Sequence, residues 1–295
     1  MVTEKSSSAS QGVDLLKHPI LPIARIVQFL YLALPSTSVD SVLDELTEPV
    51  ETVSAVYPAP GEILRPYLPI LKNFEMLKKA EKVPWIILNE QYEQEDVFEA
   101  ISLMVGQQII TRELETINSQ LCGPCRCDLC CVGPSNEMQQ DFFEIPLAAD
   151  EINLFDLPCI DTAESRNLSA LTEPPFSPDN IPFYKNPQAL YHWKTGWSII
   201  LPKETACPHL DRTSGGCVIY DQRPVTCRRP QIFPYLLEPL PDRNRDENGT
   251  VVPAYVARKK ILAIWDCPHV QEFKQEIAEY AEMCELEPVF KKNKG

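Results

Sequence analysis

All eleven cysteines of this 295-residue chain follow residue 121, and five of them fall within ten residues. This dense group lies in the segment LCGPCRCDLCCVGP, and the other six cysteines stand singly further along the chain. Thiolates at short spacing are soft ligands that enclose metal ions and iron–sulfur clusters. We therefore expect part of this chain to fold around metal held by cysteine.

The overall charge and the amino-terminal residues restrict the classes of partner. The chain has 27 Lys and Arg against 42 Asp and Glu, a formal charge of −15 that repels phosphate backbones, so we expect no nucleic-acid binding. The first residues are polar, and the apolar run 20–34 contains Pro22 and Arg25 and is shorter than the roughly 20 residues that span a bilayer. We expect a cytoplasmic protein without a membrane anchor. In that reducing compartment, clustered cysteines indicate metal or redox sites rather than disulfides.

Apolar residues at helical spacing dominate the chain before residue 119. The clearest helix is predicted over residues 92–118, where apolar side chains recur every three or four positions. A buried helix is expected over 20–34, another after Pro69, and a short strand or helix start over 84–88. We predict that residues 1–118 form a helical region without a catalytic constellation. Its default role is packing or docking of a protein partner.

Proline marks the second part of the chain, where 19 of the 28 prolines follow residue 119. Because proline fixes φ and cannot donate a backbone hydrogen bond, it excludes long regular elements from stretches such as EPPFSPDNIPFYKNP. Short strands are predicted at 142–147, 197–201 and 217–220, and helices at 254–264 and 270–284. We expect residues 119–295 to form a loop- and proline-rich cysteine-cluster domain, which gives the chain an α+β fold. Bound metal would stabilise this domain, because metal binding to a site absent from the unfolded chain adds to the folding free energy.

The spacing of the first five cysteines suits a metal site. Cys122 and Cys125, and likewise Cys127 and Cys130, are separated by two residues, so both sulfurs of each pair can reach one tetrahedral ion. Cys130 and Cys131 are adjacent, and adjacent side chains of an extended chain point to opposite sides. The adjacent pair therefore indicates either two sites that share this loop or one ligand beside a thiol that does not bind the ion.

The later cysteines are too far apart in sequence to chelate an ion by themselves. Cys207, Cys217, Cys227 and Cys267 are separated by nine, nine and 39 residues, so tertiary folding must bring them to the first group. Arg223, Arg228 and Arg229 place cations beside these thiols, which is expected to lower thiol pKa values. We interpret Cys159 and Cys284 as small buried apolar residues. His209 and His269, each two residues after a cysteine, are weaker ligand candidates.

These motifs resemble the YkgJ-type cysteine-cluster family. Its pattern runs C-x2-C-x2-C-C, then C-P-x-L, then C-x-I-Y-x-x-R-P-x-x-C-R, and then a last cysteine. In this chain CPHL begins at Cys207 and CVIYDQRPVTCR begins at Cys217, and both segments match closely. The resemblance covers roughly residues 119–275 and leaves out the helical region.

The first block of the family pattern is matched only in part. Cys127, Cys130 and Cys131 fit its end, and Cys267 fits the last cysteine of the pattern. Pro124 stands where the family has its first cysteine. Either Cys122 or Cys125 would take that place.

The resemblance implies binding of zinc, of iron or of an iron–sulfur cluster. Three functions stay open: a metal-binding protein, an iron–sulfur redox enzyme or electron carrier, and a protein-interaction module that metal only stabilises. Four thiolates suit zinc and iron alike, so the metal is not decided, and neither is enzymatic activity. The candidate acid–base residues Asp211, Tyr220, Asp221 and Asp266 are more simply turn or capping residues. The candidate metal ligands are Cys122, Cys125, Cys127, Cys130, Cys131, Cys207, Cys217, Cys227 and Cys267.

Overall fold

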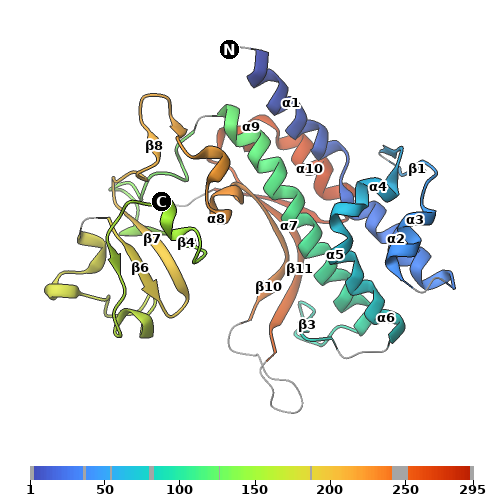
Figure 1. Cartoon of the computed structure of the whole chain (residues 1–295), viewed down its shortest axis with the longest axis horizontal. Coiled ribbons are helices and arrows are strands. Elements are labelled where there is room, and N and C mark those ends of the chain that lie inside the picture. The colour runs from blue at the N-terminus through green and yellow to red at the C-terminus, as the bar shows by residue number, and fades with distance from the viewer. Residues whose placement is uncertain are drawn as a thin grey trace. The chain divides into compact units, whose positions relative to one another are not determined.

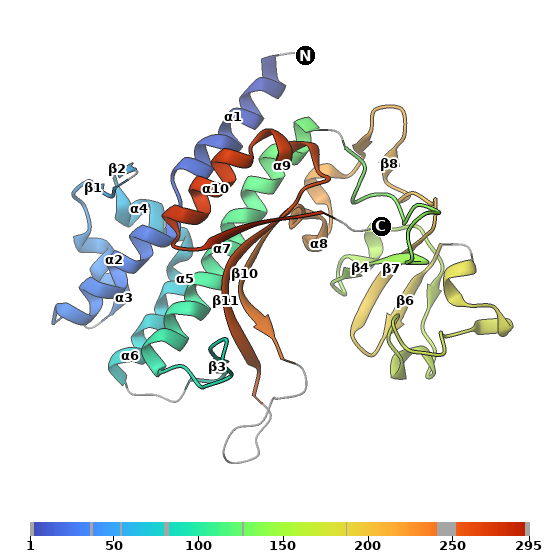
Figure 2. The same ribbon diagram turned by 180° about the vertical axis from the view of Figure 1, so that it is seen from behind.

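The chain forms two compact units that combine helices and sheets, which confirms the α+β class. Unit 1 contains Met1–Leu121 and Gln231–Lys292, and unit 2 contains Cys122–Pro230. Each unit is described by itself below (Figures 1 and 2). The computed structural model describes residues 3–35, 38–53, 55–79, 83–125, 127–186, 188–240 and 252–292.

The division into units differs from the domains expected from the sequence. The change near residue 119 lies close to the start of unit 2 at Cys122. The expected second domain, 119–295, continued to the end of the chain, whereas Gln231–Lys292 packs with the amino-terminal unit. The cysteine-rich unit is therefore inserted between two parts of unit 1.

Unit 1 is mainly helical, with a four-stranded sheet. The long helix α7 (Val97–Cys125) runs alongside β10 and β11 and continues into the start of unit 2 (Figures 1 and 2). The sheet has the order β10-β11-β12, and β3 also pairs with β11. The short strands β1 (Val50–Glu51) and β2 (Val56–Tyr57) form a hairpin. The other helices and strands are α1 (Thr3–Lys17), α2 (Ile20–Ala33), α3 (Val39–Glu45), α4 (Pro60–Leu64), α5 (Leu68–Leu71), α6 (Met76–Lys79), α9 (Pro268–Glu272), α10 (Lys274–Met283), β3 (Ile86–Leu88), β10 (Ile232–Pro239), β11 (Ala254–Ile264) and β12 (Glu287–Lys291).

The helix predicted over 254–264 is wrong: this segment is strand β11, in the middle of the sheet. It pairs antiparallel with β10 and parallel with β3 and β12. The pairing with β10 is irregular between Tyr235 and Leu237, and Lys259 has a positive φ of 52°. Across this irregularity the buried residues change from Ala254 and Val256 to Ala257, Ile261 and Ala263, so the simple alternation of a strand is broken. Buried residues therefore recur at positions 254, 257 and 261, and spacings of three and four residues imitate the helical pattern.

Other predicted elements agree with the structure, with shifted ends. The helix expected over 92–118 is α7, which starts later and continues past Pro124, and the one expected over 270–284 is α9 followed by α10. The chain after Pro69 forms short α and 3₁₀ turns instead of one helix. The stretch Ala9–Ala33 is long and apolar enough to cross a membrane, and half of its most apolar window is buried inside the structure. Buried core helices share that property, and the absence of a membrane anchor stays a prediction.

Two amides on α7, the half-buried Gln107 and the buried Asn118, hold strand β10. Gln107 Oε1 accepts hydrogen bonds from the backbone N–H groups of Leu236 and Leu237, both at 3.1 Å, where the strand pairing is irregular. Asn118 Oδ1 accepts from the N–H groups of Gln231 (3.0 Å) and Ile232 (3.2 Å), and Asn118 Nδ2 donates to the carbonyl of Ile232 at 2.9 Å. The last turns of α7 before unit 2 are therefore bonded to the first residues after it.

Unit 2 is built on the antiparallel pairs β4–β7 and β7–β6, with β5 parallel to β6 (Figure 1). These are β4 (Phe142–Leu147), β5 (Cys159–Ile160), β6 (Leu190–Trp193) and β7 (Gly196–Pro202), and the strands predicted at 142–147 and 197–201 are thereby confirmed. One apolar cluster contains Tyr191, Trp193 and Ile200, and another contains Leu190, Ile199 and Leu201. Successive strand residues alternate between the two clusters, so each cluster covers one face of the sheet. The strand predicted at 217–220 is shorter than expected and ends at Cys217.

Replacing Asn118 tests whether its side chain stabilises the base of the inserted unit. We expect Asn118→Ala to lower the free energy of unfolding by ~2–4 kcal/mol, because it leaves buried backbone donors and an acceptor without partners. Asn167→Ala is the control, since Asn167 is exposed and donates one hydrogen bond to the carbonyl of Ala163. Urea unfolding of the two variants measures the difference. An equal, small loss in both would contradict the role of Asn118.

Glu113 is a carboxyl group inside the helical core of unit 1. Its side chain is 3% exposed and accepts hydrogen bonds from the Ile20 N–H, at 3.1 Å, and from the Tyr280 hydroxyl, at 2.8 Å. Ile20 is the first residue of α2, and the preceding Pro19 provides no side-chain cap. The carboxyl therefore serves as the cap of α2 while it also binds α10. Burial raises the pKa of Glu113 to about 8, although the hydrogen bonds from Tyr280 and Ile20 act to lower it.

This raised pKa predicts a pH-dependent stability. The folded chain holds the Glu113 proton more tightly than the unfolded chain, whose ordinary value is 4.5, so stability falls as pH rises from 4.5 to 8. The expected loss is on the order of 4 kcal/mol over that range. Glu113→Gln, which does not titrate, should remove this loss, whereas Glu282→Gln on the exposed face of α10 should keep it. Chemical unfolding at several pH values measures the slope, and an unchanged slope in Glu113→Gln would refute the assignment.

Candidate metal centre

Seven of the nine predicted ligand cysteines line one cavity in unit 2. It lies beside the apolar cluster formed by Leu147, Phe155 and Ile199, against which Cys207 packs. The cavity has a volume of about 70 Å³. Ile145 and Phe155 also line it, and no motif predicted them because apolar residues do not mark a ligand site. The lining cysteines are Cys122, Cys127, Cys130, Cys131, Cys207, Cys217 and Cys227.

Backbone pairing brings the dense cysteine group to Cys207. The N–H of Cys207 donates to the carbonyl of Cys131 at 2.7 Å, and the N–H of Gly133 donates to that of Thr205 at 2.8 Å. Between them, Val132 and Ala206 form a β-bridge. A Cβ atom at Gly133 would collide with the carbonyl oxygen of Pro202, so this close approach requires glycine. Residues that are distant in sequence thus lie side by side.

Two tight turns position the remaining thiols. Strands β8 (Leu210–Asp211) and β9 (Gly216–Cys217) form a hairpin whose turn includes Gly215 at a φ of 68°. The register places Cys217 opposite Leu210. Pro224 precedes the short helix α8 (Val225–Arg228), and its carbonyl accepts a hydrogen bond from the N–H of Cys227 at 2.9 Å.

Four of these thiols all interact with one another: Cys130, Cys207, Cys217 and Cys227. Burial, together with the charges of the other three thiols, raises the pKa of Cys227 to about 12. Burial also raises the pKa of Cys207, and the charges of Cys217 and Cys130 contribute to that rise. Burial likewise raises the pKa of Cys217, and the charge of Cys130 contributes. Every one of the six pairs in this group is thus within electrostatic reach. We call these four residues the thiol tetrad.

The arginines lower the pKa values of the thiols less than expected from the sequence. Arg223 is buried and lowers the pKa values of Cys217 and Cys227, but burial and the neighbouring thiols outweigh it. Arg228 donates a hydrogen bond from Nε to the carbonyl of Arg223 at 3.1 Å. The hydrogen bond with Cys130 is the main cause that raises the pKa of Cys131, followed by burial. The raised pKa values favour the protonated form of Cys131, Cys207, Cys217 and Cys227.

Tyr220 and Arg223 form the side of the cavity next to Cys122. The Arg223 guanidinium lies 3.9 Å from the centre of the Tyr220 ring. Burial raises the pKa of Tyr220 to about 12, Arg223 counteracts the rise, and Cys122 contributes to it through charge and a hydrogen bond. Tyr220 therefore acts as a hydrogen-bonding neighbour of the Cys122 thiol. Its hydroxyl lies close to Gly123, where a Cβ atom would stand 3.2 Å from it.

His209 lines the cavity, but one of its ring nitrogens is already engaged. Its Nε2 lies 2.7 Å from the carbonyl oxygen of Leu154 and donates to it, and its ring centre is 4.9 Å from that of Phe155. Within the described part of the chain, no three His, Cys, Asp or Glu side chains already stand as ligands of one ion. The thiols share a cavity without having the spacing of a coordination sphere.

The other cysteines lie elsewhere. Cys125 is in the last turn of α7 and does not line the cavity. Cys267 belongs to unit 1, where it is buried with its Sγ 3.3 Å from Nδ1 of His269. Cys284 is buried as predicted, whereas the prediction for Cys159 is wrong, because it is exposed on the edge strand β5.

The comparisons with known proteins add no relative. No family model matches the chain, and no match was found among curated proteins or among solved structures. We therefore infer the function from the residues of this chain.

Proposed function

We propose that unit 2 binds zinc or iron through the thiol tetrad. The observation that carries this proposal is that four cysteines from three separate segments reach one cavity and all interact there. Four thiolates are a complete ligand set for tetrahedral zinc or iron. The resemblance to the YkgJ-type pattern agrees with this ligand set, since all four cysteines occupy positions of that pattern.

A bound cation would resolve the main electrostatic conflict of the cavity. Thiols must lose their protons to bind metal, and here deprotonation is opposed by burial and by the charges of neighbouring thiols. A divalent cation stabilises the thiolates and removes their mutual repulsion. Binding would draw the sulfurs inward to about 2.3 Å from the ion, and it would release protons.

The size of the cavity supports an ion over an organic substrate. Cavities that hold organic ligands have volumes of roughly 300–1,000 Å³. The cavity beside the tetrad has about 70 Å³. A metal-binding role therefore fits it better than catalysis on an organic molecule inside it.

A second candidate is an iron–sulfur redox protein, because the cavity is lined by three thiols in addition to the four that one ion needs. Cys122, Cys127 and Cys131 would then hold part of a cluster or a second ion.

Of the two alternatives for the first block of the family pattern, we propose Cys122, since it lines the cavity and Cys125 does not. Cys267 is left out of the proposed set because it belongs to unit 1.

Substitution of single cysteines tests the ligand set. We expect Cys130→Ser and Cys227→Ser to lower bound metal per chain at least about twofold, because a neutral hydroxyl is a poor replacement for a thiolate ligand. Cys122→Ser should lower it only in the second candidate, where Cys122 holds part of a cluster or a second ion, and Cys125→Ser should not lower it in either. Cys159→Ser is the matched control, since that thiol is exposed and outside the cavity. Elemental analysis of anaerobically purified protein measures the content, and an unchanged value in both Cys130→Ser and Cys227→Ser would refute the proposal.

The absorption spectrum separates the two candidates. An iron–sulfur cluster gives broad absorption at roughly 400 nm from sulfur-to-iron charge transfer, together with acid-labile sulfide. Zinc-loaded protein is colourless. Colourless protein with stoichiometric zinc would exclude the redox candidate and keep the metal-binding one.

A further inference from the structure

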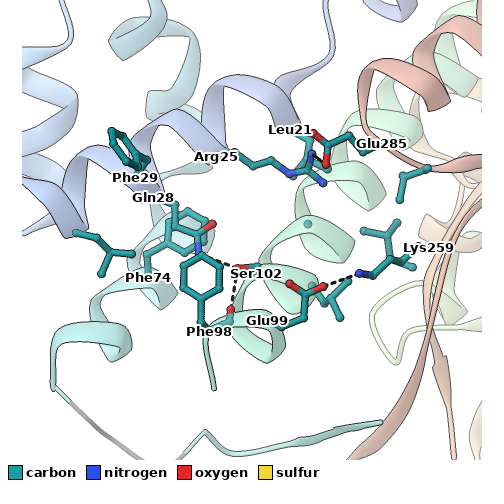
Figure 3. Close-up of a pocket in the computed structure, with 15 residues that line it drawn as sticks. Leu21, Arg25, Gln28, Phe29, Phe74, Phe98, Glu99, Ser102, Lys259 and Glu285 are labelled. Carbon is teal, nitrogen blue, oxygen red and sulfur yellow. Dashed lines mark hydrogen bonds and ion pairs between the residues drawn. The ribbon is translucent and has the colours of Figure 1, made fainter. Parts of the chain in front are cut away.

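A second cavity, unrelated to the thiols, lies inside unit 1 (Figure 3). It has a volume of about 440 Å³, within the roughly 300–1,000 Å³ of cavities that hold small organic ligands. Helices α2 and α7 contribute most of its lining, so we call it the α2–α7 cavity. The proposed metal-binding function makes no use of it.

Aromatic rings form one wall of the α2–α7 cavity. Phe29 and Phe98 line the cavity and are 69% and 48% exposed. Phe74, which also lines it, is buried. In Figure 3 the three rings lie on one side of the cavity, and the charged residues lie on the other. Single exposed apolar residues are ordinary, but two phenylalanines on the lining of one cavity indicate a surface for an apolar ligand.

Gln28 places one hydrogen-bond acceptor in this apolar setting. Its side chain is 5% exposed, and its Nε2 donates to Ser102 Oγ at 2.7 Å. Ser102 uses its own proton to donate to the carbonyl of Phe98, also at 2.7 Å, so it can only accept from Gln28. This fixes the orientation of the amide. Gln28 Oε1 is then the atom left for the cavity, and no residue that the structure describes donates to it.

The charged residues of the lining compensate one another. Arg25 Nη1 lies 2.6 Å from Glu285 Oε2, and Lys259 Nζ lies 2.6 Å from Glu99 Oε1 (Figure 3). Arg25 also donates to the carbonyl of Cys284 at 3.2 Å. A charged ligand would have to break one of these pairs, so the lining favours a neutral ligand.

We propose that the α2–α7 cavity binds a small, neutral, aromatic molecule that carries one hydrogen-bond donor. Its ring packs against Phe29 and Phe98, and its N–H or O–H donates to Gln28 Oε1. The apolar wall supplies the contact area, and the unpartnered Gln28 Oε1 supplies the selection for a donor.

Indole and benzothiophene are matched probes for this site, because they have nearly the same bicyclic shape and only indole has an N–H. We expect indole to bind the full-length protein about tenfold more tightly than benzothiophene, the effect of one hydrogen bond to a buried acceptor. Titrations followed by calorimetry and by methyl NMR shifts of the lining leucines measure both affinities. Absence of indole binding at concentrations up to about 1 mM, a range in which weak ligands of this size bind, would overturn the proposal, and so would equal affinities.

Two variants separate the acceptor from the aromatic wall. Gln28→Leu should bring the two affinities together by weakening indole alone. Phe29→Ala should weaken both probes several-fold, and this exposed position tolerates truncation without loss of the fold. Val53→Ala, a fully exposed apolar residue of unit 1 outside the cavity, should change neither affinity. If Phe29→Ala binds both probes as the wild-type chain does, the assigned wall is wrong.

Discussion

The side chain of Asn118 determines where the cysteine-rich unit leaves and rejoins the rest of the chain. Its three hydrogen bonds to Gln231 and Ile232 connect the end of α7 with the start of β10. All of unit 2 that the structure describes lies between these two points in sequence. Bringing the ends of so long a loop together costs conformational entropy. The hydrogen bonds of the buried Asn118 amide, all within unit 1, offset part of that cost. The thiols of unit 2 then need only meet within a segment whose ends are already held.

Inside unit 2 the same loops serve the apolar core and the thiol cavity. Cys207 packs against the cluster around Ile199 on one side, and on the other it bonds through its N–H to the carbonyl of Cys131. Proline-rich loops contain little regular structure, so this short backbone pairing is what connects the dense cysteine group to the segment of Cys207. Protonated thiols suit such a buried place, whereas several thiolates do not without a cation. Folding and the proposed metal binding therefore involve the same residues.

The cysteines that line the thiol cavity were easier to predict from the sequence than the topology that brings them together. Short cysteine spacing, the CPHL segment that begins at Cys207 and the segment from Cys217 to Cys227 point to the seven cysteines that line one cavity, because residue type and spacing are local properties. Cys267 follows the same motif, yet it belongs to unit 1, since β11 returns to pair with β3 near the amino-terminal helices. Such a return cannot be deduced from local spacing. The misassigned strand β11 has the same origin: the irregular pairing at Tyr235 offsets its alternation, and that depends on its neighbour β10.

The two cavities differ in a way that separates two kinds of chemistry. The thiol cavity offers soft ligands but only about 70 Å³, whereas the α2–α7 cavity offers about 440 Å³ and has no cysteine in its lining. Metal ions need little volume and several donors; aromatic molecules need apolar area and few donors. Since neither cavity meets the requirements of the other ligand, the metal-binding function proposed for unit 2 and the ligand site inferred in unit 1 stand on independent physical grounds.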